Sequence, residues 1–297
     1  MKEQNEYDTV VTPDTLKAYF TGQYDGPPWV VVDCRFNLMQ PQQGREEYHA
    51  GHIPGAFYAH LDADLSSPVT PDSGRHPLPD RDAFARLAGS WGVGPDTQVV
   101  VYDQGSGAIA ARLWWLLRWI GHGRAALLEG GYAAWLAAGG TMDAGVPERI
   151  EDASPAGVQG EHASWTGTEE LAVALGRVRL IDARDAARFR GEQEPIDTVA
   201  GHIPGAINRP FSDNLDKDGR FHDADTLRRQ FLSLPGMTDI TEGAAGVVNM
   251  CGSGVTACHN ILAMEIAGLG GSTLYVGSWS EWIRDPSRAV ETGDYNT

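Results

Sequence analysis

The sequence predicts an α/β protein of two similar domains, each a parallel sheet flanked by helices. Two observations carry this prediction. The chain repeats itself, because GHIPGAF at Gly51–Phe57 returns as GHIPGAI at Gly201–Ile207, 150 residues later. Each copy also alternates continuous apolar runs, typical of strands covered on both faces, with amphipathic stretches typical of helices. A chain of 297 residues has the length of two ordinary domains.

Three further pairs of segments recur in the same order. VVVDCR matches RLIDAR, VVVYDQGSGAIA matches VVNMCGSGVTA, and LLEGGYAAW matches LYVGSWSEW. The period is too long for a solenoid, so each copy should form a domain of its own. The stretch from Met142 to Gly157 is rich in proline and charge and has little periodicity, as expected of a connection. We therefore expect domains at 8–141 and 161–290, with a linker at 142–160.

The first copy shows the expected elements clearly. Thr12 and Pro13 are a favourable cap and first residue for a helix. WVVVD and TQVVVYD have the apolar composition of buried strands, and Phe84, Leu87 and Trp91 have helical spacing. In order, we expect a helix at 12–20, a strand at 29–33, a helix at 80–91, a strand at 97–103, a helix at 107–121 and a short strand at 125–130.

Composition and charge exclude several classes of function. The formal net charge is −17, which repels nucleic-acid phosphates and anionic lipids. The most apolar stretch, AIAARLWWLLRWIGHG, is interrupted by Arg112 and Arg118, so it is a packed helix and not a membrane span. The N-terminus lacks the pattern of an export signal. We therefore expect a cytoplasmic protein that binds neither nucleic acid nor membrane.

The cysteines indicate free thiols. Cys34, Cys251 and Cys258 cannot all pair, and none stands in a C-x-x-C motif. A reducing compartment is the simplest interpretation. No cysteine and histidine group has the spacing of a zinc site, and we expect neither a metal nor a cofactor.

Cys251 stands at the end of an expected strand, in VVNMCGSGVTACHN. The two glycines that follow let the backbone curl, so that several N–H groups face one point. A helix starting near Val255 would add its own unpaired N–H groups and the positive end of its dipole. Such a loop favours the thiolate over the thiol, and the thiolate is the nucleophile.

Three other interpretations of this loop are weaker. A buried structural cysteine would not need two glycines. A dinucleotide loop is suggested by GSGAIA and GSGVTA, but a strand precedes the loop's own strand in both copies, and Glu129 of the first copy corresponds to Val276 of the second. A cysteine phosphatase needs C-x5-R, and the arginine position is Ala257. We therefore favour a catalytic thiolate.

The repeated GHIPGA, the DAR…RF.G..EP segment, CGSGVTA and GSWSEW together resemble the tandem-domain rhodanese family of sulfurtransferases, from about Thr12 to Arg284. The resemblance implies two rhodanese-like domains, each a parallel five-stranded sheet flanked by helices. It also implies an inactive first domain and a catalytic second one, and we align Gln104 with Cys251 and Ser106 with Ser253. The loop C-G-S-G-V is that of the family's 3-mercaptopyruvate sulfurtransferases, whereas the thiosulfate enzymes carry basic residues there.

The resemblance also assigns roles. It implies that Ser253 relays protons with His76 and Asp62, with Asp64 as an alternative acid, and that Arg188 binds the substrate's carboxylate. The family's second carboxylate-binding arginine corresponds to Ile196, so another residue, such as Arg35 or Arg75, would have to serve. The N–H groups of the loop would hold the persulfide, and its binding residues are Gly252, Gly254, Val255 and Thr256.

Features shared with the inactive copy are better explained by architecture. Arg184 has a twin in Arg35 and should pair with a buried acid. His52 and His202, one in each GHIPGA motif, should cap the turn in both domains. We expect Cys258, two helical turns beyond the nucleophile, to be a packing residue.

The predicted reaction moves sulfur from 3-mercaptopyruvate through a Cys251 persulfide to an acceptor, with release of pyruvate. The acceptor would be cyanide or a thiol, such as thioredoxin or a small dithiol. Two alternatives stay open: thiosulfate as the main donor, and a non-catalytic interaction module.

Overall fold

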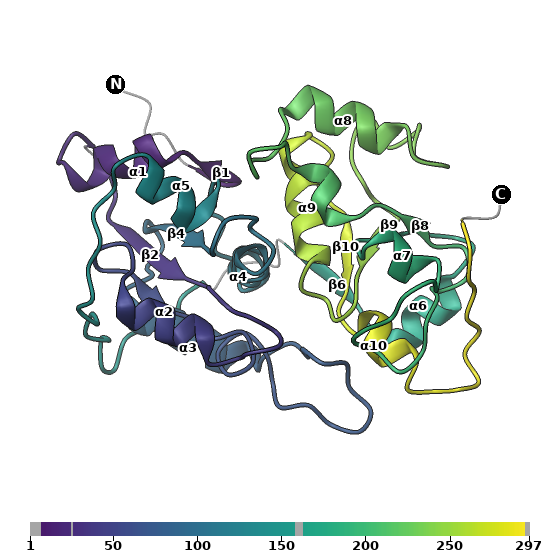
Figure 1. The fold of residues 1–297 in the computed structure, drawn as a ribbon. Helices are drawn as coiled ribbons and strands as arrows, with labels where there is room; N and C mark the ends of the chain where they lie inside the picture. The colour runs from purple at the N-terminus through teal and green to yellow at the C-terminus, as the bar shows by residue number, and fades with distance from the viewer. Residues whose placement is uncertain (1–6, 25, 158–162, 295–297) are drawn as a thin grey trace. The chain divides into compact units, whose positions relative to one another are not determined.

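The computed structural model describes residues 7–24, 26–157 and 163–294. They form two compact units (Figure 1). The first unit contains the described residues within Met1–Ser67, Pro79–His162 and Asp218–Arg220. The second contains those within Pro68–Leu78, Ala163–Lys217 and Phe221–Thr297. The predicted end of the linker at 160 and start of the second domain at 161 lie outside the described residues.

The first unit is built on a parallel five-stranded sheet with the order β1-β5-β4-β2-β3. Its central strands are long apolar runs, and every residue of β4 is buried. The strands are β1 (Val10–Val11), β2 (Trp29–Asp33), β3 (Phe57–Tyr58), β4 (Gln98–Tyr102) and β5 (Ala125–Leu128).

Two helices of this unit, α1 and α3, begin at residues whose side chains cap them. The Thr12 side chain accepts from the N–H of Thr15 at 3.2 Å, and the Asp80 side chain accepts from the N–H of Ala83 at 2.8 Å. Nine of the ten residues of α4 are buried, which confirms a packed helix in place of a membrane span. The helices are α1 (Pro13–Phe20), α2 (Gln43–Ala50), α3 (Arg81–Ser90), α4 (Ala110–Trp119) and α5 (Gly131–Ala137).

The second unit repeats this plan with the order β6-β10-β9-β7-β8, again all parallel. The prediction of two parallel five-stranded sheets flanked by helices is therefore confirmed. The strands are β6 (Ser164–Thr166), β7 (Arg179–Asp182), β8 (Ile207–Asn208), β9 (Val247–Met250) and β10 (Thr273–Tyr275). The helices are α6 (Thr168–Ala174), α7 (Ala186–Phe189), the 3-10 helix η1 (Phe211–Asn214), α8 (Ala224–Leu232), α9 (Ala257–Ile266) and α10 (Ser278–Trp282).

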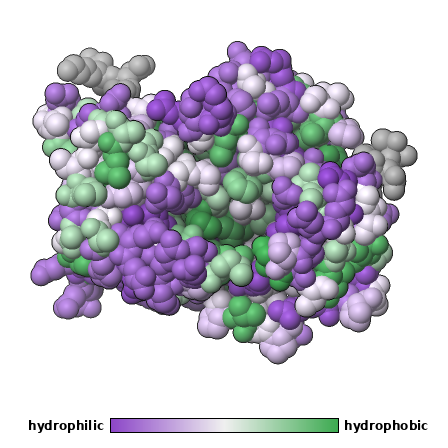
Figure 2. Space-filling model, viewed as in Figure 1, coloured by the Kyte–Doolittle hydropathy of each residue, from purple (hydrophilic) through white to green (hydrophobic). Residues whose placement is uncertain are grey.

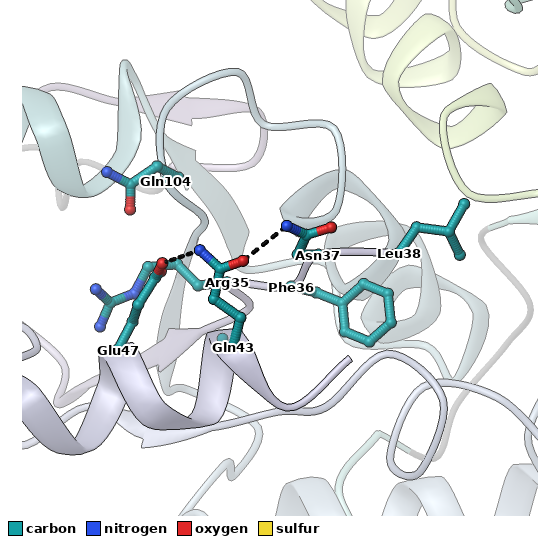
Figure 3. A pocket seen from close by; sticks show the side chains of 8 residues that line it. Arg35, Phe36, Asn37, Leu38, Gln43, Glu47 and Gln104 are labelled. Atoms are coloured by element: carbon teal, nitrogen blue, oxygen red, sulfur yellow. Dashed lines mark hydrogen bonds between the residues drawn. The ribbon is translucent and has the colours of Figure 1, made fainter. Parts of the chain in front are cut away.

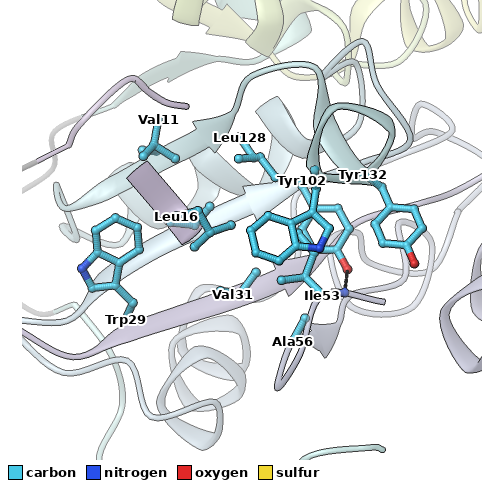
Figure 4. Close-up of a cluster of buried hydrophobic side chains, with 12 residues drawn as sticks. Val11, Leu16, Trp29, Val31, Ile53, Ala56, Tyr102, Leu128 and Tyr132 are labelled. Carbon is cyan, nitrogen blue, oxygen red and sulfur yellow. Dashed lines mark hydrogen bonds between the residues drawn. The ribbon is translucent and has the colours of Figure 1, made fainter. Parts of the chain in front are cut away.

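Each unit has its own apolar core. In the first, Leu16 of α1 packs with side chains of the sheet such as Val31 and Leu128 (Figure 4). The Tyr102 hydroxyl accepts from the N–H of Ile53 at 3.2 Å and donates to Asp33 at 2.8 Å, so its polar end is satisfied inside the core. A corresponding cluster in the second unit includes Trp279 and Trp282.

The paired motifs serve the same structural purpose in both units. Arg35 binds Asp33 through Nε and Nη2, and Arg184 binds Asp182 in the same way, with Nη2 to carboxylate distances of 2.7 Å. All four side chains are buried. Both buried ion pairs therefore stabilise the backbone at the end of a central strand.

The two GHIPGA histidines bond to backbone carbonyls. Nδ1 of His52 lies 2.7 Å from the carbonyl oxygen of Tyr48, and Nδ1 of His202 lies 2.8 Å from that of Phe189. Both rings are buried and stack on the ring of the same residue. These histidines therefore hold the turn in each unit, as expected.

Hydrophilic residues cover much of the face of each unit seen in Figure 2, in keeping with the net charge of −17. Within the described ranges, none of the helices has both the length and the apolar character needed to cross a membrane.

Candidate active site

Strand register identifies the residue of the first unit that corresponds to Cys251. Cys34 is the residue after β2, and its N–H donates to the carbonyl of Tyr102. Ala183 is the residue after β7, and its N–H donates to the carbonyl of Met250. Tyr102 and Met250 are therefore equivalent, and the residues that follow them, Asp103 and Cys251, are equivalent too.

A second pair of hydrogen bonds agrees with this register. The N–H of Tyr132 donates to the carbonyl of Asp103 at 2.9 Å, and that of Trp279 donates to the carbonyl of Cys251 at 3.0 Å. The predicted match of Gln104 with Cys251 was wrong by one residue. The loop from Asp103 to the first residue of α4 is one residue longer than the loop from Cys251 to α9, and alignment on the shared GSG hides that insertion. For the same reason, Ser106 is not a reliable twin of Ser253.

Cys251 is buried, with 2% of its surface exposed, directly after β9. Its N–H donates to Ser278 Oγ at 3.0 Å, and that hydroxyl donates to the carbonyl of Tyr275 at 2.9 Å. Ser278 has a φ of 52°, which is unusual for a residue other than glycine, and its counterpart before Tyr132 is Gly131 with a φ of 56°. Sequence reasoning missed this serine, which holds the backbone of Cys251.

The loop after Cys251 presents unused backbone donors. Among the described residues, the N–H groups of Gly252, Ser253, Val255 and Thr256 form no hydrogen bond. Gly254 has a φ of 76°, and a Cβ there would lie 2.6 Å from the carbonyl oxygen of Val276, so only glycine fits. The helix begins at Ala257, two residues later than expected. The loop is thus a short nest of N–H groups beside the sulfur.

The equivalent loop of the first unit holds an anion of its own. Oδ1 of Asp103 accepts from the N–H groups of Gly105 at 3.0 Å and Gly107 at 2.9 Å. Oδ2 accepts from those of Ile109 at 3.0 Å and Ala110 at 3.3 Å. A carboxylate therefore takes the donors that the second unit leaves open around Cys251.

His76 reaches the loop from the segment Pro68–Leu78. Its Nδ1 lies 2.7 Å from Ser253 Oγ, and both side chains are buried. The segment belongs to the second unit although it lies in the first half of the chain. Its backbone is fixed by the N–H of Arg75, which donates to Ser280 Oγ at 3.0 Å, and that of Gly74, which donates to Glu281 at 3.1 Å.

The two predicted acids of the relay come from a different part of the chain. Asp62 and Asp64 belong to the first unit, and Asp62 is exposed. Asp64 accepts from the N–H of His60 at 2.7 Å, so its carboxylate already caps a turn. Asp62 therefore remains the better candidate, and its role stays a prediction.

Arg188 lies in a network of charges next to the loop. Its Nε and Nη2 bind Glu194, the closest contact being 2.8 Å, and its Nη2 lies 3.0 Å from Asp197. Arg75 pairs with Asp197 from the other side. Burial raises the pKa of Glu194, but the hydrogen bond and charge of Arg188, together with hydrogen bonds from the N–H groups of Asp197 and Ile196, outweigh it and lower that pKa. Glu194 and Asp197 were not singled out from sequence, although Glu194 belongs to the quoted EP motif.

The other two cysteines have different surroundings. Burial raises the pKa of the Cys34 thiol well above its usual range, which makes this residue unreactive. Cys258 is fully buried on α9, and its Sγ lies 3.4 Å from the carbonyl oxygen of Gly254. Both are packing residues in this structure.

A family model described as a rhodanese-like domain matches residues 15–138 and 168–285. The chain belongs to the rhodanese-like domain family. It is 47% identical over 274 residues to a Pseudomonas aeruginosa protein named "Probable 3-mercaptopyruvate sulfurtransferase", covering 90% of this chain and 94% of that one. It is 34% identical to the 3-mercaptopyruvate sulfurtransferase of Mus musculus (94% and 93% covered) and 33% identical to the thiosulfate sulfurtransferase of the same species (99% and 98% covered).

Solved structures of rhodanese relatives have the same fold. The 3-mercaptopyruvate sulfurtransferase of Leishmania major matches with a TM-score of 0.76 at 29% identity, covering 94% of this chain and 76% of that one. SseA of Escherichia coli, named as a 3-mercaptopyruvate sulfotransferase, matches with a TM-score of 0.75 at 30% identity, covering 92% and 99%. The predicted family is confirmed.

The first rhodanese-like domain keeps a cavity beside its altered loop (Figure 3). It has a volume of about 320 Å³, and Arg35, Glu47 and Gln104 contribute to its lining. Tyr48 and Phe189 are equivalent because each accepts from the GHIPGA histidine, so Glu47 stands where the second domain has Arg188. Glu47 Oε1 accepts from Gln43 at 2.7 Å. A carboxylate replaces the guanidinium, and another replaces the thiol, which makes this cavity unsuited to an anionic substrate.

Proposed function

We propose that this protein is a sulfurtransferase that takes sulfur from 3-mercaptopyruvate through a persulfide on Cys251. The observation that carries the proposal is the loop after β9, where unpaired N–H groups and the Ser253–His76 pair surround a buried cysteine. Relatives over most of the chain that are named for this activity support the choice of donor.

The Cys251 thiolate attacks the sulfur of 3-mercaptopyruvate, and a new S–S bond forms. The bond between that sulfur and C3 breaks, and its electron pair stays on carbon as the enolate of pyruvate. The proton of the substrate thiol ends on that carbon, so no other reactant is needed. Ser253, hydrogen-bonded to His76 at 2.7 Å, is placed to carry this proton from sulfur to carbon.

The persulfide is an anion at neutral pH, and the loop supplies donors for it. The loop from Gly252 to Thr256 was expected to bind it, and within the described part of the chain the N–H groups of Gly252, Ser253, Val255 and Thr256 form no hydrogen bond. The first domain supports this role, because its equivalent loop binds the carboxylate of Asp103 with four such groups. A thiol such as thioredoxin or a small dithiol, or cyanide, would then attack the outer sulfur and restore the Cys251 thiolate.

Thiosulfate is the second candidate donor. The positive charges of Arg75 and Arg188 beside the loop favour binding of any small anion, and a thiosulfate sulfurtransferase is among the relatives. When thiosulfate gives its outer sulfur to Cys251, sulfite is the leaving group, and no proton has to be transferred to carbon. The serine should therefore matter far less for this donor than for 3-mercaptopyruvate.

Mass spectrometry after incubation with each donor tests the proposal. The wild-type protein should gain the mass of one sulfur atom and lose it on treatment with cyanide, while Cys251→Ser should gain nothing. Ser253→Ala should slow persulfide formation from 3-mercaptopyruvate about 100-fold and from thiosulfate only slightly. Ser106→Ala, in the loop of the first domain, is the matched control and should behave like wild type. A sulfur adduct on Cys251→Ser, or equal effects of Ser253→Ala on both donors, would contradict the mechanism.

A further inference from the structure

We propose that the first unit has a binding site of its own, beside Glu47, for a small organic cation with an ammonium group on an apolar stem. Two cavities of this unit, each of about 320 Å³, share Arg35, Glu47 and Gln104 in their linings. Cavities of this size hold small molecules. All the lining residues belong to the first unit, so the inference is independent of the chemistry at Cys251.

The carboxylate of Glu47 is held in place without a counter-charge. Asn37 Nδ2 donates to Gln43 Oε1 at 2.7 Å, and Gln43 Nε2 donates to Glu47 Oε1 at 2.7 Å (Figure 3). The other oxygen, Oε2, has neither a hydrogen bond nor an ion pair with any residue that the structure describes. Arg45 of the same helix instead lies over the ring of Tyr58, 5.4 Å from its centre. A fixed carboxylate therefore has one oxygen available to a ligand.

Helix stability does not explain this carboxylate. Glu47 stands in the last turn of α2, where a negative charge is unfavourable because the helix dipole is negative at that end. In the second unit the equivalent Arg188 has the favourable sign and pairs with two acids, Glu194 at 2.8 Å and Asp197 at 3.0 Å. A cation from outside the chain would give Glu47 the partner that Arg188 finds within its own unit.

The hydroxyl of Tyr132 is a second group without a partner in one of these cavities. The residue is only 6% exposed, and its hydroxyl forms no hydrogen bond within the described ranges. The equivalent Trp279 has no such deficit, because its Nε1 donates to the carbonyl of Val199 at 2.9 Å. A buried hydroxyl without a hydrogen bond is unfavourable unless a ligand supplies one. Tyr132 lines the same cavity as Glu47 and Gln104.

These groups match an ammonium ion. Glu47 Oε2, the Tyr132 hydroxyl and the amide oxygen of Gln104 are three acceptors on one cavity, and a primary ammonium has three N–H donors. Arg35 also lines the cavity, but its charge is balanced by Asp33, which it binds through Nε at 2.9 Å and Nη2 at 2.7 Å. The charge left over is that of Glu47, which favours a cation over an anion.

The rest of the cavity wall is apolar. Ala50, Leu136 and Met142 contribute to it, and Leu136 and Met142 are 41% and 62% exposed. An apolar stem on the ligand would remove part of this surface from water. The favoured ligand is therefore an amine with a hydrocarbon or aromatic stem, in place of an inorganic cation.

Calorimetric titration of the full-length protein with three matched compounds tests the inference. Phenethylamine carries the cation, 2-phenylethanol is its neutral counterpart, and 3-phenylpropanoate is the anion. The wild-type protein should bind the amine at least about tenfold more tightly than the alcohol, and the acid should not bind, because only the amine forms a charge-assisted hydrogen bond with Glu47. The amine should also raise Tm, since it binds the folded chain.

Variants assign the binding to the two unpaired groups. Glu47→Gln should weaken binding of the amine about tenfold or more, and Tyr132→Phe about threefold, as expected for loss of a charged and of a neutral acceptor. Glu46→Gln is the matched control, because Glu46 is an exposed carboxylate of the same helix, and it should bind the amine like wild type.

Glu47→Arg gives this position the charge of Arg188 and should bind the acid in preference to the amine. It also carries the test if Glu47→Gln does not fold, which thermal unfolding checks. Equal affinities of the wild-type protein for the three compounds, or wild-type binding of the amine by Glu47→Gln, would overturn the inference. Either result would leave the proposed function untouched, because sulfur transfer is not part of these measurements.

Discussion

The loops after β4 and after β9 leave equivalent strands of two similar sheets, yet one is closed by the protein itself and the other is open. In the first unit, Asp103 fills the nest with its own carboxylate. In the second, Cys251 occupies that position, and among the residues that the structure describes the N–H groups of Gly252, Ser253, Val255 and Thr256 have no acceptor. The comparison teaches that the fold provides a site for an anion in both halves. A single residue at the end of the strand decides whether the anion is a carboxylate of the protein, as with Asp103, or the sulfur of the proposed reaction at Cys251.

The charged side chains beside the two loops also differ between the units. Glu47 in the first unit takes the place of Arg188 in the second, so the charge next to the loop is reversed. The second unit adds Arg75 from the segment Pro68–Leu78. The charge beside the loop is therefore unfavourable for an anion in the first unit and favourable in the second.

The largest expected effect comes from making the second loop like the first. Cys251→Asp should abolish sulfur transfer from either donor, because no thiolate remains. It should also stabilise the protein by about 1 kcal/mol, a shift of a few degrees in Tm, since the carboxylate can accept from the loop N–H groups. Calorimetry of this variant beside Cys251→Ser gives the comparison. A Tm below that of Cys251→Ser would contradict the equivalence of the two loops.

The converse change should destabilise the first unit. Asp103→Ala leaves four backbone donors without their acceptor and should cost about 2–4 kcal/mol in the free energy of unfolding. Amide hydrogen exchange at Gly107 and Ile109 should accelerate. Asp96→Ala removes an exposed carboxylate of the same unit and should change stability by less than about 0.5 kcal/mol. Equal effects of the two substitutions would show that the carboxylate of Asp103 is not needed.

The smallest expected effect concerns Asp197, the acid beside the open loop. Burial raises its pKa despite the positive charge of Arg75, so it takes up a proton at a pH where an ordinary aspartate is still ionised. The pKa of Glu194 is lowered, so Asp197 is the acid of this network whose charge changes first as the pH falls. Pyruvate, still ionised, then meets less negative charge.

Pyruvate affinity should therefore rise a few-fold as the pH falls through the raised pKa of Asp197, above the range in which an ordinary aspartate takes up its proton. Asp197→Asn should bind pyruvate with an affinity that no longer depends on pH in this range. Calorimetric titrations at several pH values measure both. An affinity that falls with pH in the wild-type protein would reverse the expected sign and contradict this account of the network.

Much of the fold followed from the sequence for simple reasons. The apolar runs of β2 and β4 are buried on both faces, and the repeated GHIPGA motif marks a turn held by His52 and His202 in both units. The loop chemistry of Cys251 could also be predicted, because a glycine-rich turn between a strand and a helix presents N–H groups wherever it occurs.

Other features depend on register and on distant contacts. Gln104 was aligned with Cys251 because matching glycines outweigh a one-residue insertion, whereas hydrogen bonds between strands identify Asp103. Arg75 and Asp197 are 122 residues apart and meet only when the segment Pro68–Leu78 joins the second unit. No local pattern encodes such a meeting. The pairing of His76 with Ser253 was anticipated only through the family resemblance.

The membership of Pro68–Leu78 in the second unit has a consequence for the history of the chain. The repeat indicates that one ancestral gene was doubled, and the first copy now carries Asp103 where the second carries Cys251. That copy cannot now be discarded, because a shortened gene encoding only residues 163–297 would lack His76 and Arg75. Under the proposed function, these eleven residues from the first half of the chain serve the chemistry of the second copy, so selection for that chemistry preserves both copies.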